Sequence, residues 1–408
     1  MNNTDCSNRK IQNLTVLLIG NYGYDCQESM RRFAELLHRE LPKHGIRTEL
    51  IRPEPWIGRL KPSPVGIGKW LGYVDKFFIF PFVLRKKIRA LRETIARSSV
   101  EVRDLIVHIC DHSNAHYVHH IHNVPHIVMC HDLIAIRAAM GEFSNIRIKW
   151  TGRIYQRLIV SGMKRARNIA FDSEATLGDC ERIIGKSKGF FGTIHIPINY
   201  PYSPMDNVLA EECLNKIHIK KTCRFILHVG TEVWYKNRLG VMSIFSRISD
   251  LSLKLIMVGP PINPEFTRRY GIEERVHTCQ NLSNETLQAL YSRAECLLFP
   301  SIEEGFGWPI VEAQACGCPV VTTIRRPMTE VGGEAAVYID PAMEDVAAAA
   351  VESVLSRSRA ERAAWKERGL KNAARFSTVR IIGALVNAYD CVSSEEGKAS
   401  AKQHSRPL

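Results

Sequence analysis

Short apolar runs rich in valine, isoleucine and leucine recur along the chain, each followed by a turn or helix-capping signal and then an amphipathic stretch. Such runs are typical of buried strands, and the stretches between them have the period of helices. The alternation predicts β-α units around parallel sheets, which is an α/β fold. The predicted strands are 14–19, 105–110, 126–130, 225–229, 254–258, 296–299 and 319–323.

Two of the intervening helices have clear end signals. Residues 28–41 form one predicted helix, and Gly45 ends it because glycine readily adopts the left-handed conformation found after helices. Residues 284–294 form another predicted helix, with the hydroxyl of Ser283 as its N-cap.

The chain divides at residues 197–204, which contain three prolines and no hydrophobic periodicity. We predict an N-terminal Rossmann-like domain over 1–204 and a second such domain over 205–376. A C-terminal helix over 377–392 is expected to return to the N-terminal domain. The basic segment 393–408 has the composition of a disordered tail. At 408 residues, the chain is long enough for each domain to bury its own core.

Polar and glycine-containing loops follow the predicted strands. In open parallel sheets, ligands bind beyond the carboxyl ends of the strands, so these loops are where a site is expected. Two such domains facing each other would form one cleft. The loops begin with residues 20–23, 111–112, 131–132, 230–237, 259–260 and 301–309.

The most informative segment is 299–323, which reads FPSIEEGFGWPIVEAQACGCPVVTT. Its two loop glycines, Gly305 and Gly307, allow backbone N–H groups to approach a ligand closely. Pro309 suits the first turn of a helix that Gly317 can end. The N-terminus of that helix would favour a phosphate or a polar sugar. A simpler alternative is a plain loop followed by a helix whose glutamate is favoured by the helix dipole alone.

This segment resembles the donor-site signature of family 4 of the retaining glycosyltransferases, which have the GT-B architecture of two Rossmann-like domains. The stretch 226–237, ILHVGTEVWYKN, is similar to that family's phosphate loop. The stretch 328–336, MTEVGGEAA, with the Asp-Pro pair at 340–341, is similar to the segment that follows. Several motifs in the family's order give the resemblance its specificity, and it covers roughly residues 126–341.

The resemblance implies roles for individual residues. Lys236 would contact the donor diphosphate, Glu312 the ribose, and residues 304–307 the transferred sugar. His131 matches a histidine that lies over the reacting sugar, so His131 and Glu304 are the predicted catalytic residues. The predicted donor-binding residues are Thr231, Lys236, Asn237, Leu282, Gly305, Phe306, Gly307 and Glu312. The predicted acceptor-side residues are Gly20, Tyr22, Gly23, Asp111 and His112.

The chain departs from the family pattern in two places. Many relatives carry an arginine near the phosphate lysine, but here Thr231 and Tyr235 occupy the corresponding places. Phosphate neutralisation would then depend more on Lys236 and on backbone dipoles. The glycine pair of the first loop is only loosely matched by Gly20 and Gly23, which leaves the acceptor contacts there less defined.

The expected chemistry requires no metal. A lysine and a helix N-terminus can stabilise the charge that develops on a leaving diphosphate, and the chain contains no Asp-x-Asp motif. His131 could accept the acceptor's proton or bond a sugar hydroxyl; the alternative is a core histidine bonded to the backbone. His112, His116 and His120 have the spacing of metal ligands on one helical face, but no glutamate or cysteine accompanies them. We therefore predict no cofactor beyond the donor substrate.

The net charge of +13 is concentrated in the first half of the chain. Between residues 59 and 97 there are ten basic residues and only Asp75 and Glu93 as acids. Such a face can bind nucleic acid, anionic lipid or phosphorylated substrates, or can simply be solvated. Residues 70–84 mix six aromatic side chains with cations, a composition found at membrane surfaces. A buried helix or an inserted hairpin is the alternative for this segment.

Taken together, the sequence predicts a retaining hexosyltransferase that uses a nucleoside-diphosphate sugar and a glycan or lipid-linked acceptor. The alternatives are a glucan or disaccharide synthase on the same fold and a basic nucleic-acid-binding protein, although no nucleic-acid-binding motif is present. No Gly-x-Gly-x-x-Gly follows the first strand, which argues against an NAD-dependent oxidoreductase. The scattered cysteines and the absence of a signal-like segment predict a cytoplasmic protein. The aromatic and basic residues around 70–84 add an anionic membrane surface as a predicted partner.

Overall fold

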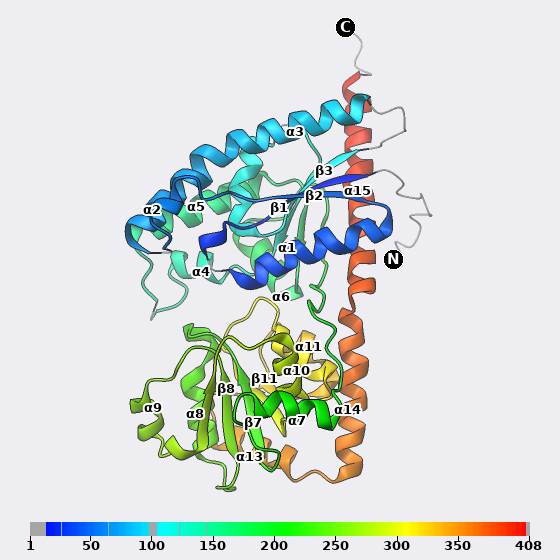
Figure 1. Ribbon diagram of the computed structural model, residues 1–408. Coiled ribbons are helices and arrows are strands. Elements are labelled where there is room, and N and C mark those ends of the chain that lie inside the picture. Colours follow the sequence, from blue (N-terminus) through cyan, green and yellow to red (C-terminus); the bar gives the residue numbers. More distant parts are fainter. Residues whose placement is uncertain are drawn as a thin grey trace. The chain divides into compact units, whose positions relative to one another are not determined.

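The computed structural model describes residues 14–25, 27–63, 65–97, 104–121, 123–144 and 146–404, with side chains described up to residue 393 (Figure 1). Its contacts divide the chain into two compact units. Unit 1 comprises Met1–Asp172, Thr176–His195 and Ile381–Leu408. Unit 2 comprises Ser173–Ala175 and Ile196–Arg380. The chain therefore passes into unit 2 at the front of the proline-containing segment.

Unit 1 is built on a parallel sheet of six strands in the order β2-β1-β3-β4-β5-β6. Its central strands β1, β3 and β4 are buried at every position, which explains their largely apolar sequences. The strands are β1 (Thr15–Ile19), β2 (Arg47–Ile51), β3 (Leu105–Ile109), β4 (His126–Cys130), β5 (Ile169–Phe171) and β6 (Phe191–Thr193).

The helices of unit 1 include one broad turn. A π-helical turn, η4 (Asp75–Ile79), joins α2 to α3. The α-helices are α1 (Glu28–Glu40), α2 (Gly66–Val74), α3 (Phe80–Arg97), α4 (Ile134–Met140), α5 (Trp150–Arg165), α6 (Glu174–Ile183) and α15 (Thr378–His404). The 3-10 helices are η1 (Gly23–Asp25), η2 (Leu41–His44), η3 (Gly58–Leu60) and η5 (His112–His120).

The π-helical turn is anchored by two buried charges. Asp75 accepts hydrogen bonds from the backbone N–H groups of Ile57 and Gly58, each at 2.8 Å, and from the Tyr22 hydroxyl at 3.0 Å. The Nζ atom of Lys76 lies 2.9 Å from Oδ2 of Asp25. Buried charges are tolerated when they are paired in this way, and the pairs hold α2 and α3 to the first loop of the sheet.

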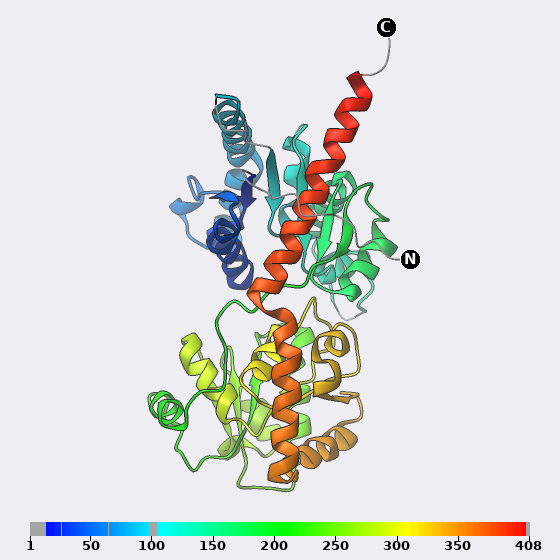
Figure 2. The same cartoon turned by 90° about the vertical axis from the view of Figure 1, so that its right-hand side faces the viewer.

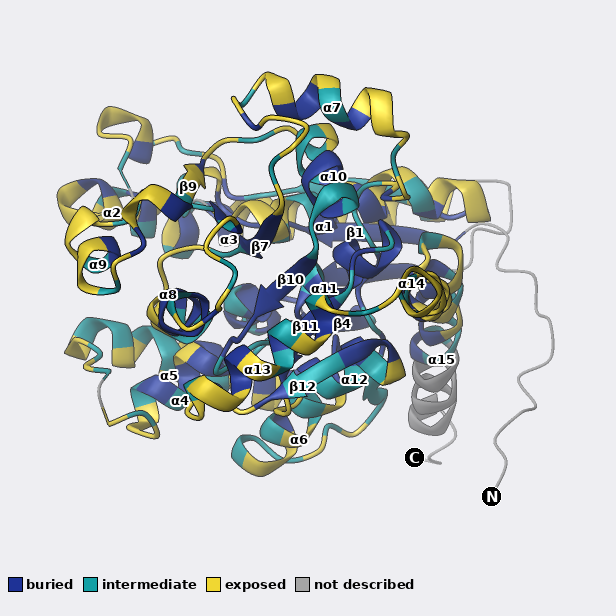
Figure 3. Cartoon of the chain, turned by 90° about the horizontal axis from the view of Figure 1, so that it is seen from below, coloured by how far each residue is buried: buried dark blue, intermediate teal, exposed yellow. Residues whose placement is uncertain are grey.

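Unit 2 has a second parallel sheet of six strands, in the order β12-β11-β10-β7-β8-β9. Strand β10 is buried along its whole length (Figure 3). The strands are β7 (Phe225–Val229), β8 (Lys254–Val258), β9 (Val276–Cys279), β10 (Cys296–Phe299), β11 (Val320–Thr323) and β12 (Ala336–Ile339). The helices are α7 (Asn207–Asn215), α8 (Arg238–Ser246), α9 (Pro264–Arg269), α10 (Asn284–Arg293), α11 (Trp308–Ala315), α12 (Met328–Gly332), α13 (Glu344–Leu355) and α14 (Arg359–Ala373), with 3-10 turns η6 (Trp234–Lys236), η7 (Glu273–Arg275), η8 (Gly333–Ala335) and η9 (Ala374–Phe376).

Helix α15 packs on unit 1, where Figure 2 shows it along the sheet. Its buried positions Ile382, Leu385, Tyr389 and Val392 share one face of the helix. The hydroxyl of Tyr389 lies 2.6 Å from Nδ1 of His108, a buried residue of β3. The contact ties the end of the chain to the centre of the first sheet.

The sequence predicted a disordered tail from residue 393, but the backbone of α15 is helical through His404. The segment contains glutamate, lysine and alanine, which favour helix, and no proline before residue 407. A charged composition therefore did not prevent an existing helix from being extended. Residues 405–408 lie outside the described part of the chain.

Asn237 fixes the loop after β7. Its backbone is in the left-handed region, with φ at 52°. Its side-chain oxygen accepts the N–H of Gly240 at 3.2 Å and so caps α8, while Nδ2 donates to the carbonyl of Pro300 at 3.1 Å. Asparagine tolerates this backbone conformation better than most residues do. One side chain therefore joins the loops that follow β7 and β10.

Replacing Asn237 with alanine should destabilise the protein by about 2 to 3 kcal/mol, because the cap is lost and a Cβ residue is held in the left-handed region. Asn237→Gly removes the same hydrogen bonds without the backbone strain and should cost about 1 kcal/mol less. Urea unfolding of both variants measures the difference. Equal stability of the alanine variant and the parent would contradict this role.

Candidate active site

In both sheets the strand order reverses at one point, and a ligand site is expected there. In unit 2 the chain proceeds from β7 outward through β8 to β9 and then returns to place β10 beside β7. In unit 1 it proceeds from β1 to β2 and then places β3 on the other side of β1. Loops diverge at such switch points, and ligands bind in the crevice that results. Most of the predicted site residues lie in the loops at these two points.

The loops at the switch point of unit 2 are bonded to each other. The N–H of Ile302, after β10, donates to the carbonyl of Tyr235, after β7, at 2.7 Å. The bond from Asn237 to Pro300 adds a second link. Gly259, after β8, approaches the same region so closely that a Cβ there would lie 2.1 Å from the carbonyl oxygen of Gly230. Only glycine fits at this position.

Lys236 and Glu304 form an ion pair in this region. The Nζ atom of Lys236 lies 2.6 Å from Oε1 of Glu304, and the two side chains are only 16% and 7% exposed. Nζ also lies 5.0 Å from the centre of the Phe299 ring, within the range of a cation–π contact. The structure thus brings together two residues that the sequence assigned to the diphosphate and to the sugar. Their roles toward a donor stay predictions.

The glycine loop leads directly into α11. Gly307 adopts a left-handed conformation, with φ at 101°, at the N-cap position of α11, where it has no side chain to satisfy the first N–H groups of the helix. Pro309 occupies the first turn, and Gly317, with φ at 77°, follows the end, as the sequence predicted. Phe306 is buried and packs on Phe376 at 5.4 Å. The helix therefore begins at the switch point with its positive end.

Glu312 lies on α11 and is buried. Its Oε2 atom accepts a hydrogen bond of 2.8 Å from the hydroxyl of Tyr291, which belongs to α10. Burial and the neighbouring carboxylate of Glu312 raise the pKa of Tyr291 well above its usual value, so the phenol keeps its proton and donates. Sequence reasoning missed Tyr291, since no local signal connects it with Glu312.

The remaining predicted donor residues are less closely grouped. Thr231 is exposed in the loop after β7. Leu282 is half-buried and follows β9, the edge strand that lies two positions away from β7 in the sheet. The roles of Thr231 and Leu282 toward a donor stay predictions.

Asp111 centres the polar group at the switch point of unit 1. It accepts hydrogen bonds from the N–H of Ser113 at 2.9 Å, from the Ser113 hydroxyl at 2.8 Å, and from Nδ2 of Asn21. Nδ1 of His112 lies 3.2 Å from Oδ1 of Asp111. Burial alone would raise the pKa of Asp111, but its contacts with His112 and the charge of His131 lower it. Asp111 therefore stays ionised, and its carboxylate accepts its hydrogen bonds from neighbouring residues of the protein.

Tyr22 also makes its polar contact within the protein. Its hydroxyl donates to Asp75, and glycines at 58 and 72 leave room for its ring. Burial, followed by the hydrogen bond to Asp75, raises the pKa of Tyr22. Gly20 and Gly23 lie at either end of this loop, and neither has a positive φ. Tyr22 is thus an anchor for the acceptor-side loop.

His131 follows β4, as the sequence predicted, and is buried. Its Nε2 atom lies 2.8 Å from the carbonyl of Cys110, and Nδ1 lies 3.5 Å from Oδ2 of Asp172. Burial alone would lower the pKa of His131, but Asp172 and the charge of Asp111 raise it. This geometry agrees with the alternative in which the imidazole is bonded to the backbone. A role over the sugar stays a prediction, and Asp172 is a neighbour that the sequence did not reveal.

The histidine series at 112, 116 and 120 does not lie on one helical face. The segment is the 3-10 helix η5, whose turn contains three residues, so that positions four apart point about 120° away from each other. His116 packs instead against the rings of Phe77 and Tyr117. Within the residues described, no three histidine, cysteine or acidic side chains come together in the manner of a metal site.

Comparison with known proteins gives the fold and a family likeness for part of the chain. Sucrose-phosphate synthase from Thermosynechococcus elongatus is 15% identical, with a TM-score of 0.64 over 96% of this chain and 99% of that structure. HepE of Anabaena, in complex with UDP and glucose, is 16% identical, with a TM-score of 0.65 over 92% and 99%. At such low identity these likenesses describe the fold, which is GT-B.

Sequence relatives match a shorter part. O-antigen chain mannosyltransferase B of Escherichia coli is 36% identical over 177 residues, which are 40% of this chain and 45% of that protein. The match thus spans less than half of the relative's length. Residues 210–372 match the family model of glycosyl transferases group 1. This range contains the loops after β7 and β10, the ion pair and α11. The likeness to the glycosyl transferases group 1 therefore lies in unit 2 and covers less than half of the chain.

Proposed function

We propose that the protein is a glycosyltransferase that moves a hexosyl group from a nucleoside-diphosphate sugar to a hydroxyl of a glycan or lipid-linked acceptor. The observation that carries the proposal is the pair of Lys236 and Glu304 at the switch point where α11 begins. The family match covers this region. A relative named for mannosyl transfer favours mannose as the first sugar to test. A structural neighbour whose title names UDP and glucose favours a nucleotide-sugar donor.

The proposed chemistry follows from where charge develops. When the bond between the sugar and the diphosphate breaks, negative charge grows on the leaving phosphate and positive charge on the anomeric carbon. Lys236 and the N-terminus of α11 would stabilise the phosphate, because both present fixed positive charge. The carboxylate of Glu304 would oppose the positive charge on the sugar. Independence from a metal and retention of configuration are further parts of the proposal.

The donor is identified by ligand-induced stabilisation. Among UDP, GDP and ADP, one should raise the melting temperature of the purified chain, since a ligand at 100 times its dissociation constant stabilises a protein by about 2.7 kcal/mol. Lys236→Ala should then lower turnover of the matching nucleotide sugar by roughly 2 to 4 kcal/mol of transition-state stabilisation. Product NMR reports the anomeric configuration. Near-normal turnover by Lys236→Ala, or loss of the parent's activity in a chelator, would oppose the proposal.

Glu304 and Glu312 should affect different kinetic constants. Glu312→Gln should mainly raise the donor KM, because a buried contact to the nucleotide is present before and during the reaction. Glu304→Gln should mainly lower kcat, because its charge matters most as the sugar becomes positive. Both are measured with saturating acceptor. If Glu304→Gln raises only KM, the assignment of roles is wrong.

We also propose attachment to an anionic membrane surface through the helices α2 and α3. One side of this segment is in the core, with Phe80 and Leu84 buried. The other side exposes Trp70, Phe78 and Phe82, which are 56%, 67% and 71% exposed. Exposed basic residues flank them at positions 69, 85 and 86. Among the described residues, no helix combines the length and apolar character needed to cross a bilayer.

Vesicle flotation tests this surface. The chain should bind vesicles that contain anionic lipid and dissociate at high salt, because each nearby cation contributes about 1 kcal/mol. The double variant Phe78→Ser and Phe82→Ser should bind less, whereas Leu251→Ser, which removes an equally exposed apolar side chain from unit 2, should not change binding. Equal binding to neutral vesicles, or none at low salt, would refute the membrane surface.

A further inference from the structure

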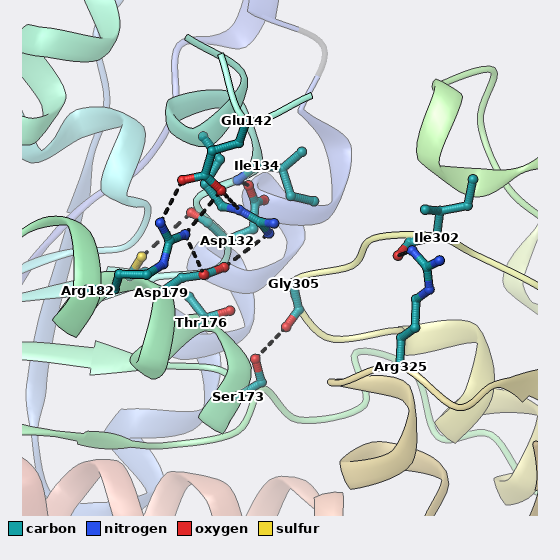
Figure 4. Close-up of polar contacts among 12 residues, drawn as sticks. Asp132, Ile134, Glu142, Ser173, Thr176, Asp179, Arg182, Ile302, Gly305 and Arg325 are labelled. Atoms are coloured by element: carbon teal, nitrogen blue, oxygen red, sulfur yellow. Dashed lines mark hydrogen bonds and ion pairs between the residues drawn. The ribbon is translucent and has the colours of Figure 1, made fainter. Parts of the chain in front are cut away.

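Arg325 reaches the same loop as Lys236 from another strand. It lies between β11 and α12, and its Nη1 atom is 3.4 Å from the carbonyl oxygen of Ile302, toward which its side chain points (Figure 4). Ile302 is the residue whose N–H bonds to Tyr235. A chain of contacts therefore runs from the loop after β7, through the loop after β10, to Arg325.

The loop after β11 is held in position by its own strand. The hydroxyl of Thr323 donates to the carbonyl of Ser301 at 3.0 Å, and the N–H of Ile324 donates to the carbonyl of Ile339 at 3.1 Å. Arg325 is thus the next residue after an anchored pair. The sheet therefore fixes the backbone from which the side chain of Arg325 projects.

The positive charge of Lys236 alone does not balance the negative charges of a nucleoside diphosphate. The single cation of the loop after β7, Lys236, is already paired with Glu304. A nucleoside diphosphate ester carries about two negative charges, and each is costly to bury without a partner. Among the described ion pairs none includes Arg325, which is exposed and whose only described hydrogen bond is a long one to a carbonyl. A planar guanidinium offers several donors that match phosphate oxygens.

We propose that Arg325 is a second ligand of the donor phosphates, acting with Lys236 from the other side of residues 302–304. The inference rests on the proposed use of a nucleoside-diphosphate donor. Two cations then share the diphosphate, and the carboxylate of Glu304 remains available for the transferred sugar. Arg325 acts on phosphate only, so the nucleoside is bound without its help.

Binding calorimetry on the full chain tests the proposal with UDP, GDP and ADP and with the corresponding nucleosides. Arg325→Gln should weaken the nucleoside diphosphate that binds by about tenfold, as expected for a lost charge-assisted contact. Affinity for the nucleoside should not change. Arg325→Lys, which keeps the charge but not the planar fork, should recover part of the loss.

The matched control is Arg268→Gln on α9. Arg268 is also exposed and also makes a 3.4 Å hydrogen bond to a backbone carbonyl, that of Pro264. It should bind the nucleotide as the parent does. Equal nucleotide affinity of Arg325→Gln and the parent overturns this inference and leaves the proposed function intact, as does an equal loss for nucleoside and nucleotide. If the parent binds none of UDP, GDP and ADP and turns over no sugar of any of them, the proposed function fails first.

Discussion

The arrangement of loops at the switch point of unit 2 depends on the order in which the strands of its parallel sheet are added. Strands β7 and β10 are neighbours in the sheet, but their last residues, Val229 and Phe299, are 70 positions apart in the chain. Their loops must diverge, and Asn237 limits that divergence by bonding to the carbonyl of Pro300 while it caps α8. The pairing of Lys236 with Glu304 follows from this constraint, because each side chain projects from a loop that the asparagine holds.

The two units use the same topology differently. At the switch point of unit 2, opposite charges from two loops meet each other, and a helix begins beside them. At the switch point of unit 1, the carboxylate of Asp111 is satisfied by Asn21, Ser113 and His112. The first arrangement can exchange an internal partner for a charged ligand, whereas the second is already complete and mainly fixes the shape of its loop.

Short stretches of sequence predicted those strands and loops whose structure depends mainly on neighbouring residues. Strands 126–130, 225–229, 254–258 and 296–299 were predicted with the bounds that the structure has, because a mostly buried strand is a largely apolar run. The edge strands β2 and β9 escaped prediction because they face solvent and mix polar with apolar residues. Strands β5, β6 and β12 escaped because they have only three or four residues each. The glycine loop was predictable from Gly307 and Pro309. The contacts of Glu312 with Tyr291 and of His131 with Asp172 join distant parts of the chain, so no spacing rule could predict them.

The π-helical turn between α2 and α3 affects the spacing of buried and exposed positions in the sequence around it. Buried positions there recur every four residues, at Gly72, Lys76, Phe80, Leu84 and Ile88, and so do the exposed positions Trp70, Val74, Phe78 and Phe82. In a regular α-helix, a step of four residues overshoots one turn by about 40°, and such a stripe would wind away around the axis. The wider π turn absorbs part of the overshoot. Loss of a single residue there would rotate α3 by about 100° relative to α2 and separate Phe82 from Trp70, so the register of this segment matters as much as its composition.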